Sequence, residues 1–159
     1  MSRHASERGI SVVEVLIGVA LFALIVVFVS HAVSLFLASA ERSQHTVRAL
    51  YLAQEGQEVL RFLRDDNWSD ITDLSTDTMY YFDLGPTAVA TTTVTELVDG
   101  RYTRSFILRE VYRDSDDDVV ASTTAGASVD AGSRRAVVRV EWGGERVQLE
   151  TILTNIFNI

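Results

Sequence analysis

The chain has 159 residues, of which 47% are hydrophobic, with one proline and no cysteine. Without cysteine it can form no disulfide, no thiolate nucleophile and no cysteine metal site. The net charge of −8 at pH 7 argues against direct binding of nucleic acid, because contact with phosphates requires a basic face. The length suggests one domain, or one domain with an appendage.

The N-terminal region divides into a short polar leader and a long apolar run. Residues 1–9, MSRHASERG, are polar and weakly basic, and no Asp, Glu, Lys or Arg occurs from Val15 to Ala40. At about 1.5 Å per residue, the apolar run exceeds the hydrocarbon thickness of a bilayer, about 30 Å. It is also longer than the apolar region of a secretory signal peptide, although Ala38-Ser39-Ala40 resembles a signal-peptidase site and leaves conventional cleavage as an alternative. We predict a membrane-spanning helix over 10–40, with a cytoplasmic N-terminus and the remainder outside the membrane.

One carboxylate lies inside the apolar run. Glu14 stands between Val13 and Val15, and placing an ionised carboxylate in hydrocarbon costs at least about 2.5–3.5 kcal/mol. Glu14 therefore either lies at the level of the lipid headgroups, where water solvates it, or pairs with a cation supplied by another subunit.

The residues around Glu14 resemble the class III signal of type IV prepilins, with Gly9 followed by Ile10-Ser11-Val12-Val13-Glu14-Val15-Leu16-Ile17. The resemblance implies that a prepilin peptidase cuts after Gly9 and methylates Ile10 as the new N-terminus. It also implies that Glu14 neutralises the N-terminal amine of a neighbouring subunit during assembly. The family commonly has Phe first and Thr-Leu-Ile before the glutamate, and major pilins often carry a proline midway along the apolar helix. The departures at Ile10 to Val13 and the missing proline favour a minor subunit with a continuous helix.

A second helical segment is predicted over 41–66. Residues 41–64 contain no proline, and their apolar residues recur at spacings of three and four, which indicates an amphipathic helix packed under a β-sheet of the same chain. Asp65-Asp66-Asn67 ends the pattern, and Trp68 is expected to pack against the head. The predicted apolar stripe consists of Ala49, Leu52, Ala53, Gly56, Val59, Leu60 and Leu63.

Residues 67–159 are predicted to form a β-rich globular head. The segments 78–84, 87–98 and 102–113 are rich in Thr, Val, Tyr and Ile, and Pro86 and Asp99-Gly100 punctuate them. This pattern is typical of strands joined by turns.

The C-terminal hairpin is the most specific element of the predicted head. Strands over 136–142 and 145–157 are joined by Gly143-Gly144, and glycine reaches the positive φ of a two-residue turn without steric cost. This register places a charged pair on one face and apolar pairs on the other. The predicted pairs are Glu141–Arg146, Val140–Val147 and Val138–Leu149. The chain as a whole is predicted to be α+β, with a long N-terminal helix whose second half packs against an antiparallel sheet.

The segment 114–133 is predicted to be a polar, flexible loop. Its alternating Asp114, Asp116 and Asp118 are candidate Ca²⁺ ligands. The EF-hand pattern, however, requires a glycine and a glutamate where this chain has Val119 and Ala125. A solvated acidic turn is the favoured interpretation and calcium binding the alternative; no other cofactor is expected.

The sequence does not predict an enzyme. His4, His31 and His45 lie in three different segments, and the chain has no GxSxG, HExxH or phosphate-binding glycine loop.

We expect a structural subunit, a minor pilin of a type IV pilus-like filament. The alternatives are a type II secretion pseudopilin and a single-span anchored binding protein that does not assemble. The resemblance implies, as partners, a prepilin peptidase, other pilin-like subunits, an assembly platform with its motor ATPase, and the inner membrane. The assembled filament would be extracellular or periplasmic.

Overall fold

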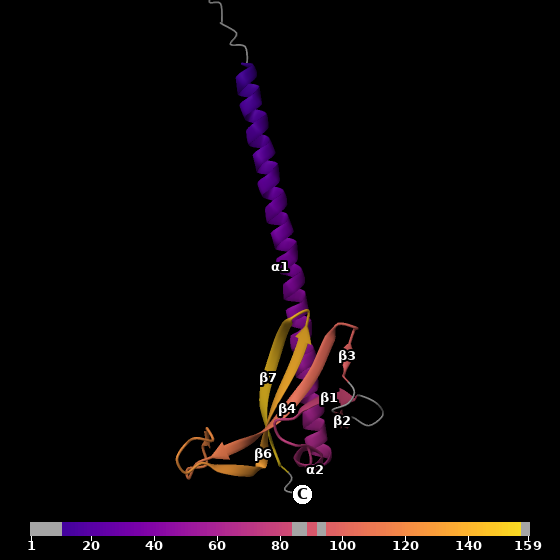
Figure 1. Ribbon diagram of the computed structural model, residues 1–159, viewed down its shortest axis with the longest axis vertical. Helices are drawn as coiled ribbons and strands as arrows, with labels where there is room; N and C mark the ends of the chain where they lie inside the picture. Colours follow the sequence, from indigo (N-terminus) through magenta and orange to yellow (C-terminus); the bar gives the residue numbers. More distant parts are fainter. Residues whose placement is uncertain (1–10, 84–88, 92–94, 157–159) are drawn as a thin grey trace, which may run out of the picture. The chain divides into compact units, whose positions relative to one another are not determined.

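The computed structural model describes residues 11–83, 89–91 and 95–156, and the chain divides into two compact units, residues 1–44 and 45–159. Helix α1 (Val12–Asp66) extends through the boundary between them (Figure 1). The second unit also contains the short helix α2 (Ser69–Thr72) and a β-sheet. The predicted α+β class is confirmed, and so is the continuous helix. Residues 1–10, which include the predicted leader and cleavage position, lie outside the described residues.

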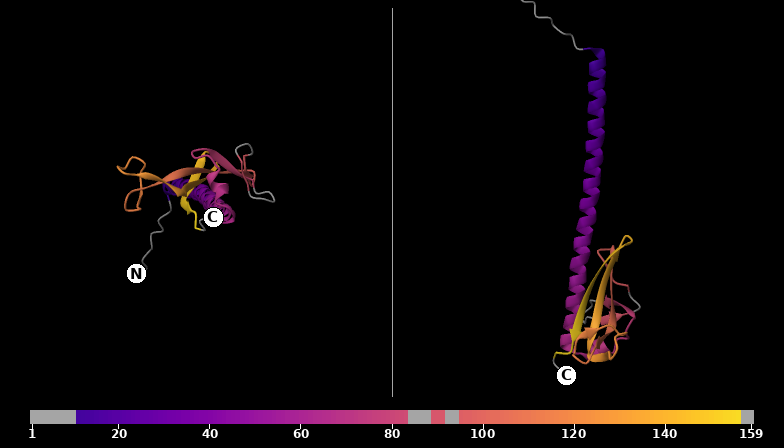
Figure 2. Two further views of the ribbon diagram at one scale, coloured as in Figure 1. Left: turned by 90° about the horizontal axis from the view of Figure 1, so that it is seen from below. Right: turned by 90° about the vertical axis from the view of Figure 1, so that its left-hand side faces the viewer.

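In the second unit, α1 from residue 45 onward packs along one face of the sheet (Figure 2). The predicted apolar stripe is confirmed: Ala49, Leu52, Ala53, Gly56, Leu60 and Leu63 are buried, and Val59 is partly buried against the core. The helix and the sheet lie close together at Gly56, where an added Cβ would lie 2.9 Å from Val138 Cγ1 and 3.2 Å from Phe82 Cζ. Trp68 also packs against the core, as expected.

The sheet is antiparallel and has seven strands among the described residues, in the order β2-β1-β4-β6-β7, with β3 and β5 paired to β4. Strand β4 organises it, because β6 pairs along nearly all of its length while β3, β1 and β5 each pair with a different part of it. The strands are β1 (Met79–Asp83), β2 (Val89–Thr91), β3 (Leu97–Val98), β4 (Tyr102–Arg113), β5 (Val119–Val120), β6 (Ser128–Trp142) and β7 (Glu145–Thr154).

The core lies between α1 and the sheet face formed by alternate residues of β4 and β6. Aromatic rings dominate its centre: Phe106 stacks on Tyr80 with ring centroids 5.6 Å apart and meets Phe82 at 4.8 Å. The buried residues of the two strands on this face include Tyr102, Phe106, Leu108, Ala136, Val138 and Val140. The period-two burial follows from the alternation of side chains along a strand.

The predicted strands over 78–84 and 102–113 are confirmed as β1 and β4. The hairpin register is confirmed as well, with Glu141 opposite Arg146, and the two predicted apolar pairs also face each other. Gly143 and Gly144 adopt φ of +50° and +86°, the left-handed backbone that a two-residue turn needs.

The single strand predicted over 87–98 is wrong. Strand β2 pairs with β1, whereas β3 pairs with β4, and Thr95 and Glu96 between them lie outside strands. The chain therefore changes partners within this segment, a tertiary choice that β-propensity does not encode. Pro86 lies outside the described residues.

The flexible loop predicted over 114–133 is also wrong in part. It contains β5, and β6 begins at Ser128, because pairing with β4 resumes after a register shift between Glu110 and Tyr112. Pairing between strands uses backbone groups and does not require apolar side chains. The polar composition of this segment therefore predicted a loop where β6 begins. At the other end β7 stops at Thr154, before the predicted end at residue 157, which lies outside the described residues.

Candidate functional site

The N-terminal half of α1 presents a surface that is largely apolar, with few polar side chains. One helix near the N-terminus is long and apolar enough to cross a membrane. Within the first unit its large hydrophobic side chains, from Val12 to Leu37, are between 47% and 74% exposed. A helix that is apolar on all sides is stable only in a membrane or against other apolar surfaces.

Glu14 lies in the first turn of α1, on this apolar surface, and is exposed. Its backbone N–H donates to the Ser11 carbonyl at 2.9 Å, and Val15 N–H donates to the same carbonyl at 3.2 Å. The spacing Ser11-x-x-Glu14 is that of a capping box, and an acidic residue in the first turn also complements the positive end of the helix dipole. Glu14 therefore lies at a position where a carboxylate favours the start of a helix. The predicted cleavage and methylation residues, Gly9 and Ile10, lie outside the described residues.

The aspartates proposed as calcium ligands lie in a turn that follows Arg113 directly in the chain. Asp114 Oδ1 accepts the backbone N–H groups of Asp116 and Asp118 at 3.0 and 3.1 Å, which closes a tight turn. Arg113 donates through Nη1 to the Asp117 carbonyl at 2.7 Å and through Nε to Asp130 Oδ2 at 2.8 Å. Arg113 thus links this turn, through Asp117, to Asp130 on β6.

The contact between Arg113 and Asp130 shifts the pKa of both side chains. The hydrogen bond from Arg113, followed by one from Ser133, lowers the pKa of Asp130, and the bond to Asp130 raises the pKa of Arg113. Among the residues that the structure describes, no group of three or more His, Cys, Asp or Glu is arranged to hold a metal ion. Calcium binding by Asp114, Asp116 and Asp118 stays a hypothesis, which calorimetry with millimolar Ca²⁺ would test.

A buried arginine, which was not predicted, joins α1 to the sheet. Arg104 on β4 is 1% exposed and forms two bonds with Glu96, at 2.8 Å from Nε and 2.6 Å from Nη2. Its Nη1 donates to the Leu52 carbonyl on α1 at 3.2 Å and lies 3.2 Å from Glu55 Oε2. The guanidinium also lies 5.0 Å from the centre of the Phe82 ring, a cation–π distance.

The energetic balance at Arg104 favours the charged form. Burial would lower the pKa of Arg104, but the hydrogen bond and the charge of Glu96, with a further contribution from Glu55, raise it above its ordinary value. The cluster could have been inferred from the alternation of β4, in which Arg104 falls on the same face as Tyr102 and Phe106. It crosslinks the second half of α1 with β4 and the segment before β3.

His45, at the start of the second unit, has a polar partner at each of its ring nitrogens. Its Nδ1 lies 2.7 Å from the Tyr102 hydroxyl, and its Nε2 lies 2.6 Å from Arg101 Nη1. Because a guanidinium can only donate, Nε2 is the acceptor and the Nδ1 proton points to Tyr102. Tyr102 also contacts Trp142, with ring centroids 6.0 Å apart. The arrangement orients an imidazole against the core.

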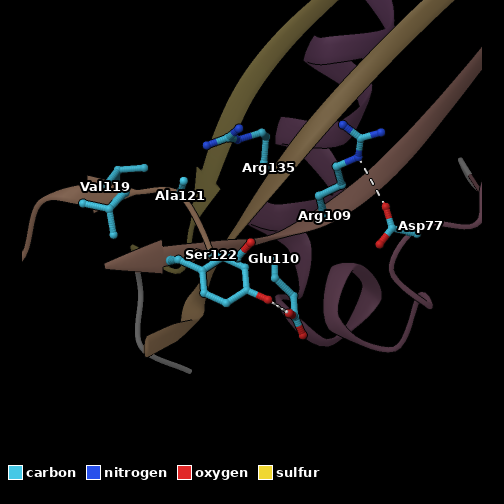
Figure 3. Close-up of a pocket in the computed structure, with 9 residues that line it drawn as sticks. Asp77, Arg109, Glu110, Val119, Ala121, Ser122 and Arg135 are labelled. Atoms are coloured by element: carbon cyan, nitrogen blue, oxygen red, sulfur yellow. Dashed lines mark hydrogen bonds and ion pairs between the residues drawn. The ribbon is translucent and has the colours of Figure 1, made fainter. Parts of the chain in front are cut away.

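An open polar pocket of about 570 Å³ lies beside the end of β4. Figure 3 shows Arg109 reaching toward Asp77, with the guanidinium of Arg135 extended away from that pair. Arg109 Nε lies 3.3 Å from Asp77 Oδ1, and the Tyr112 hydroxyl donates to Glu110 Oε2 at 2.6 Å. That bond to the carboxylate raises the pKa of Tyr112. Sequence reasoning did not single out this pocket.

Comparisons with protein-family models, with curated proteins and with solved structures find no match for this chain.

Proposed function

We propose that this chain is a minor subunit of a type IV pilus-like filament, anchored in the inner membrane and assembled through its N-terminal helix. The observation that carries the proposal is the apolar surface of α1 from Val12 to Leu37, with one carboxylate, Glu14, in its first turn. This surface needs either lipid or other apolar helices around it. A subunit that moves from a membrane into a helical bundle exchanges contacts with lipid for contacts with other apolar helices.

The role of Glu14 in this proposal is to pair with the N-terminal amine of a neighbouring subunit. Cleavage after Gly9 would create that amine at Ile10, where a prepilin peptidase would also methylate it. A carboxylate and an ammonium in an apolar bundle each lose hydration, and pairing offsets part of this loss. An unpaired carboxylate there would oppose assembly, so Glu14 favours docking in one axial position.

The remaining parts follow from this arrangement. The leader stays in the cytoplasm, and the head, with the second half of α1, lies outside the cytoplasmic membrane. The assembly platform and its motor ATPase extract the subunit from the inner membrane. The Arg104 cluster, which joins α1 to β4 and Glu96, supports the proposal because it would transmit force from the helix to the head.

The first experiment tests cleavage. The full chain is expressed with a prepilin peptidase, and the N-terminus of the product is mapped by intact mass. We expect a chain that begins at Ile10 and carries one added methyl group, and Gly9→Val should remain uncut. Gly18→Val is the matched control, because an added Cβ at Gly18 meets no atom within 4 Å. A mature size that is the same in Gly9→Val and the unaltered chain would contradict the proposal.

The second experiment separates assembly from cleavage. Glu14→Gln keeps the shape of the side chain but removes its charge, so we expect normal cleavage with loss of the subunit from sheared filaments. Glu58→Gln, at an exposed position of α1, is the control and should be incorporated normally. Undiminished incorporation of Glu14→Gln would show that pairing with an amine is not needed. A chain that is cut but never found in filaments would instead be a non-assembling anchor.

A further inference from the structure

The segment that joins α1 to α2 (Figure 1) contains an asparagine followed two positions later by a serine. Its sequence, Asn67-Trp68-Ser69, is the N-x-S/T pattern of an acceptor for N-linked oligosaccharide, with a residue other than proline in the middle. The pattern occurs once in the 159 residues. Such a short pattern also arises by chance, so the surroundings of Asn67 determine whether it is suited to this chemistry.

Asn67 is exposed at the end of α1, while the residues around it anchor the chain. Its backbone N–H donates to the Leu63 carbonyl at 3.0 Å, and its own carbonyl accepts the N–H of Asp70 at 3.0 Å. Trp68 packs against the core, and Ile71 is fully buried. The asparagine side chain is therefore presented to solvent by a backbone that is fixed on both sides.

The amide group of Asn67 is oriented by the serine of the same pattern. Its Oδ1 accepts the backbone N–H of Ser69 at 3.1 Å, and none of the residues that the structure describes accepts a hydrogen bond from its Nδ2. Because Nδ2 is the atom that bonds to the sugar, this arrangement leaves the reacting atom accessible. Bacterial oligosaccharyltransferases also require an acidic residue two positions before the asparagine, and Asp65 meets that requirement.

We infer that Asn67 is the acceptor of an oligosaccharide that a membrane-bound oligosaccharyltransferase transfers from a lipid pyrophosphate. Nδ2 of Asn67 forms a bond to the anomeric carbon of the first sugar, and the bond from that carbon to the pyrophosphate oxygen breaks. The lipid pyrophosphate leaves with the electron pair of the broken bond, and the amide nitrogen loses one of its two protons. The inference rests on the part of the proposed function that places the head outside the cytoplasmic membrane, and it does not require the role of Glu14.

The test is made on the full chain in bacteria that carry an oligosaccharyltransferase and a lipid-linked oligosaccharide on the outer side of the inner membrane. An exported protein with a known acceptor site, made in the same cells, verifies that transfer takes place. We expect the intact mass of the chain to increase by the mass of one oligosaccharide, and fragmentation of a tryptic glycopeptide should place it on Asn67. An unchanged mass, in cells where the second protein is glycosylated, would overturn the inference.

Matched variants separate recognition of the pattern from an effect on folding. Asn67→Gln and Ser69→Ala should abolish the added mass, whereas Ser69→Thr, which keeps the hydroxyl group, should retain it. Asn155→Gln removes an asparagine outside the pattern, so it is the control and should leave the added mass unchanged. If Ser69→Ala were glycosylated as fully as the unaltered chain, the pattern would not be what the enzyme reads, and the inference would be wrong.

A topology measurement keeps failure of this inference distinct from failure of the proposed function. The chain has no cysteine, so Ser115→Cys, at an exposed position of the head, reports where the head lies when intact cells are treated with a membrane-impermeant maleimide. A labelled chain without the added mass contradicts glycosylation alone. A chain that is labelled only after the membrane is opened contradicts the topology and therefore both proposals. A glycosylated chain that is absent from filaments supports this inference and contradicts the proposed assembly.

Discussion

Arg104 and Glu96 form a two-pronged ion pair in the interior of the head, with Nη2 of the arginine 2.6 Å from Oε1 of the glutamate and Nε 2.8 Å from Oε2. The arginine side chain is 1% exposed and that of the glutamate 14%. The second carboxylate near this guanidinium, Glu55, is 55% exposed. Two carboxylates thus share one cation, but only Glu96 meets it away from water.

The first prediction follows from this difference. Glu96→Gln should lower the free energy of unfolding of the head by about 3 kcal/mol, because it leaves the charge of Arg104 buried with a solvent-exposed partner. Glu55→Gln should lower it by less than about 1 kcal/mol, the usual contribution of an exposed ion pair. Urea titration of the full chain in a mild detergent, followed by fluorescence of the buried Trp142, measures both. Equal losses of stability in the two variants would show that burial does not determine how much the Arg104–Glu96 ion pair contributes to the free energy of unfolding.

The second prediction concerns Gly56, where α1 lies close to the sheet. In Gly56→Ala the gain in helix propensity, about 1 kcal/mol, competes with overpacking, which costs about 1–3 kcal/mol. The added Cβ would lie 2.9 Å from Val138 Cγ1 and 3.3 Å from Arg104 Cδ, so we expect a net loss of stability in the same urea titration.

A double-mutant cycle checks the cause of that loss. Val138→Ala removes the methyl group that the new Cβ would meet, so the double variant should lose less stability than the sum of the two single losses. Additive losses would point instead to a change in α1 that does not involve β6.

Much of the fold could be predicted from local patterns. The stripe of α1 and the hairpin register were predictable because each depends on a period, 3.6 or 2, that the chain maintains over many residues. The partner change before Leu97 and the start of β6 at Ser128 were not predictable, because they depend on which strand lies alongside. The pairing of Arg104 with Glu96 was not predictable for a related reason, because Glu96 lies in a segment whose composition predicts a strand.

The open pocket could not be predicted from local sequence patterns. Arg109 and Arg135 are far apart in the sequence, and only the register of β4 with β6 makes them neighbours. The residues proposed from resemblance, Gly9 and Ile10, lie outside the described residues. Of that set the structure places only Glu14, at the start of α1. The fold was therefore more predictable than the sites, since sites depend on contacts between distant segments.

The third prediction concerns the hairpin turn. Gly143 and Gly144 have φ of +50° and +86°, a pair that suits the Asn-Gly sequence of a type I′ turn. Gly143→Asn should therefore leave the free energy of unfolding within about 0.5 kcal/mol, because asparagine tolerates left-handed backbone. Gly143→Val should lower it by about 1–2 kcal/mol, the cost of left-handed backbone for a residue with a Cβ. If both variants lost the same stability, the turn would not depend on the backbone angle.

The last prediction is the pH dependence of the Arg113–Asp130 pair. The hydrogen bond from Arg113 lowers the pKa of Asp130 in the folded protein, so at acidic pH the unfolded chain takes up this proton first. The stability that the pair contributes is therefore complete above the unfolded value, about pH 3.9, and is lost as the pH falls through the lower folded value. Asp130→Asn should be less stable than the unaltered chain near neutral pH, with a difference that shrinks below about pH 4. Asp116→Asn is the control, because its side chain has no partner within the described residues and its difference from the unaltered chain should stay small at every pH. A difference for Asp130→Asn that is independent of pH would mean that the carboxylate acts through its shape and not through its charge.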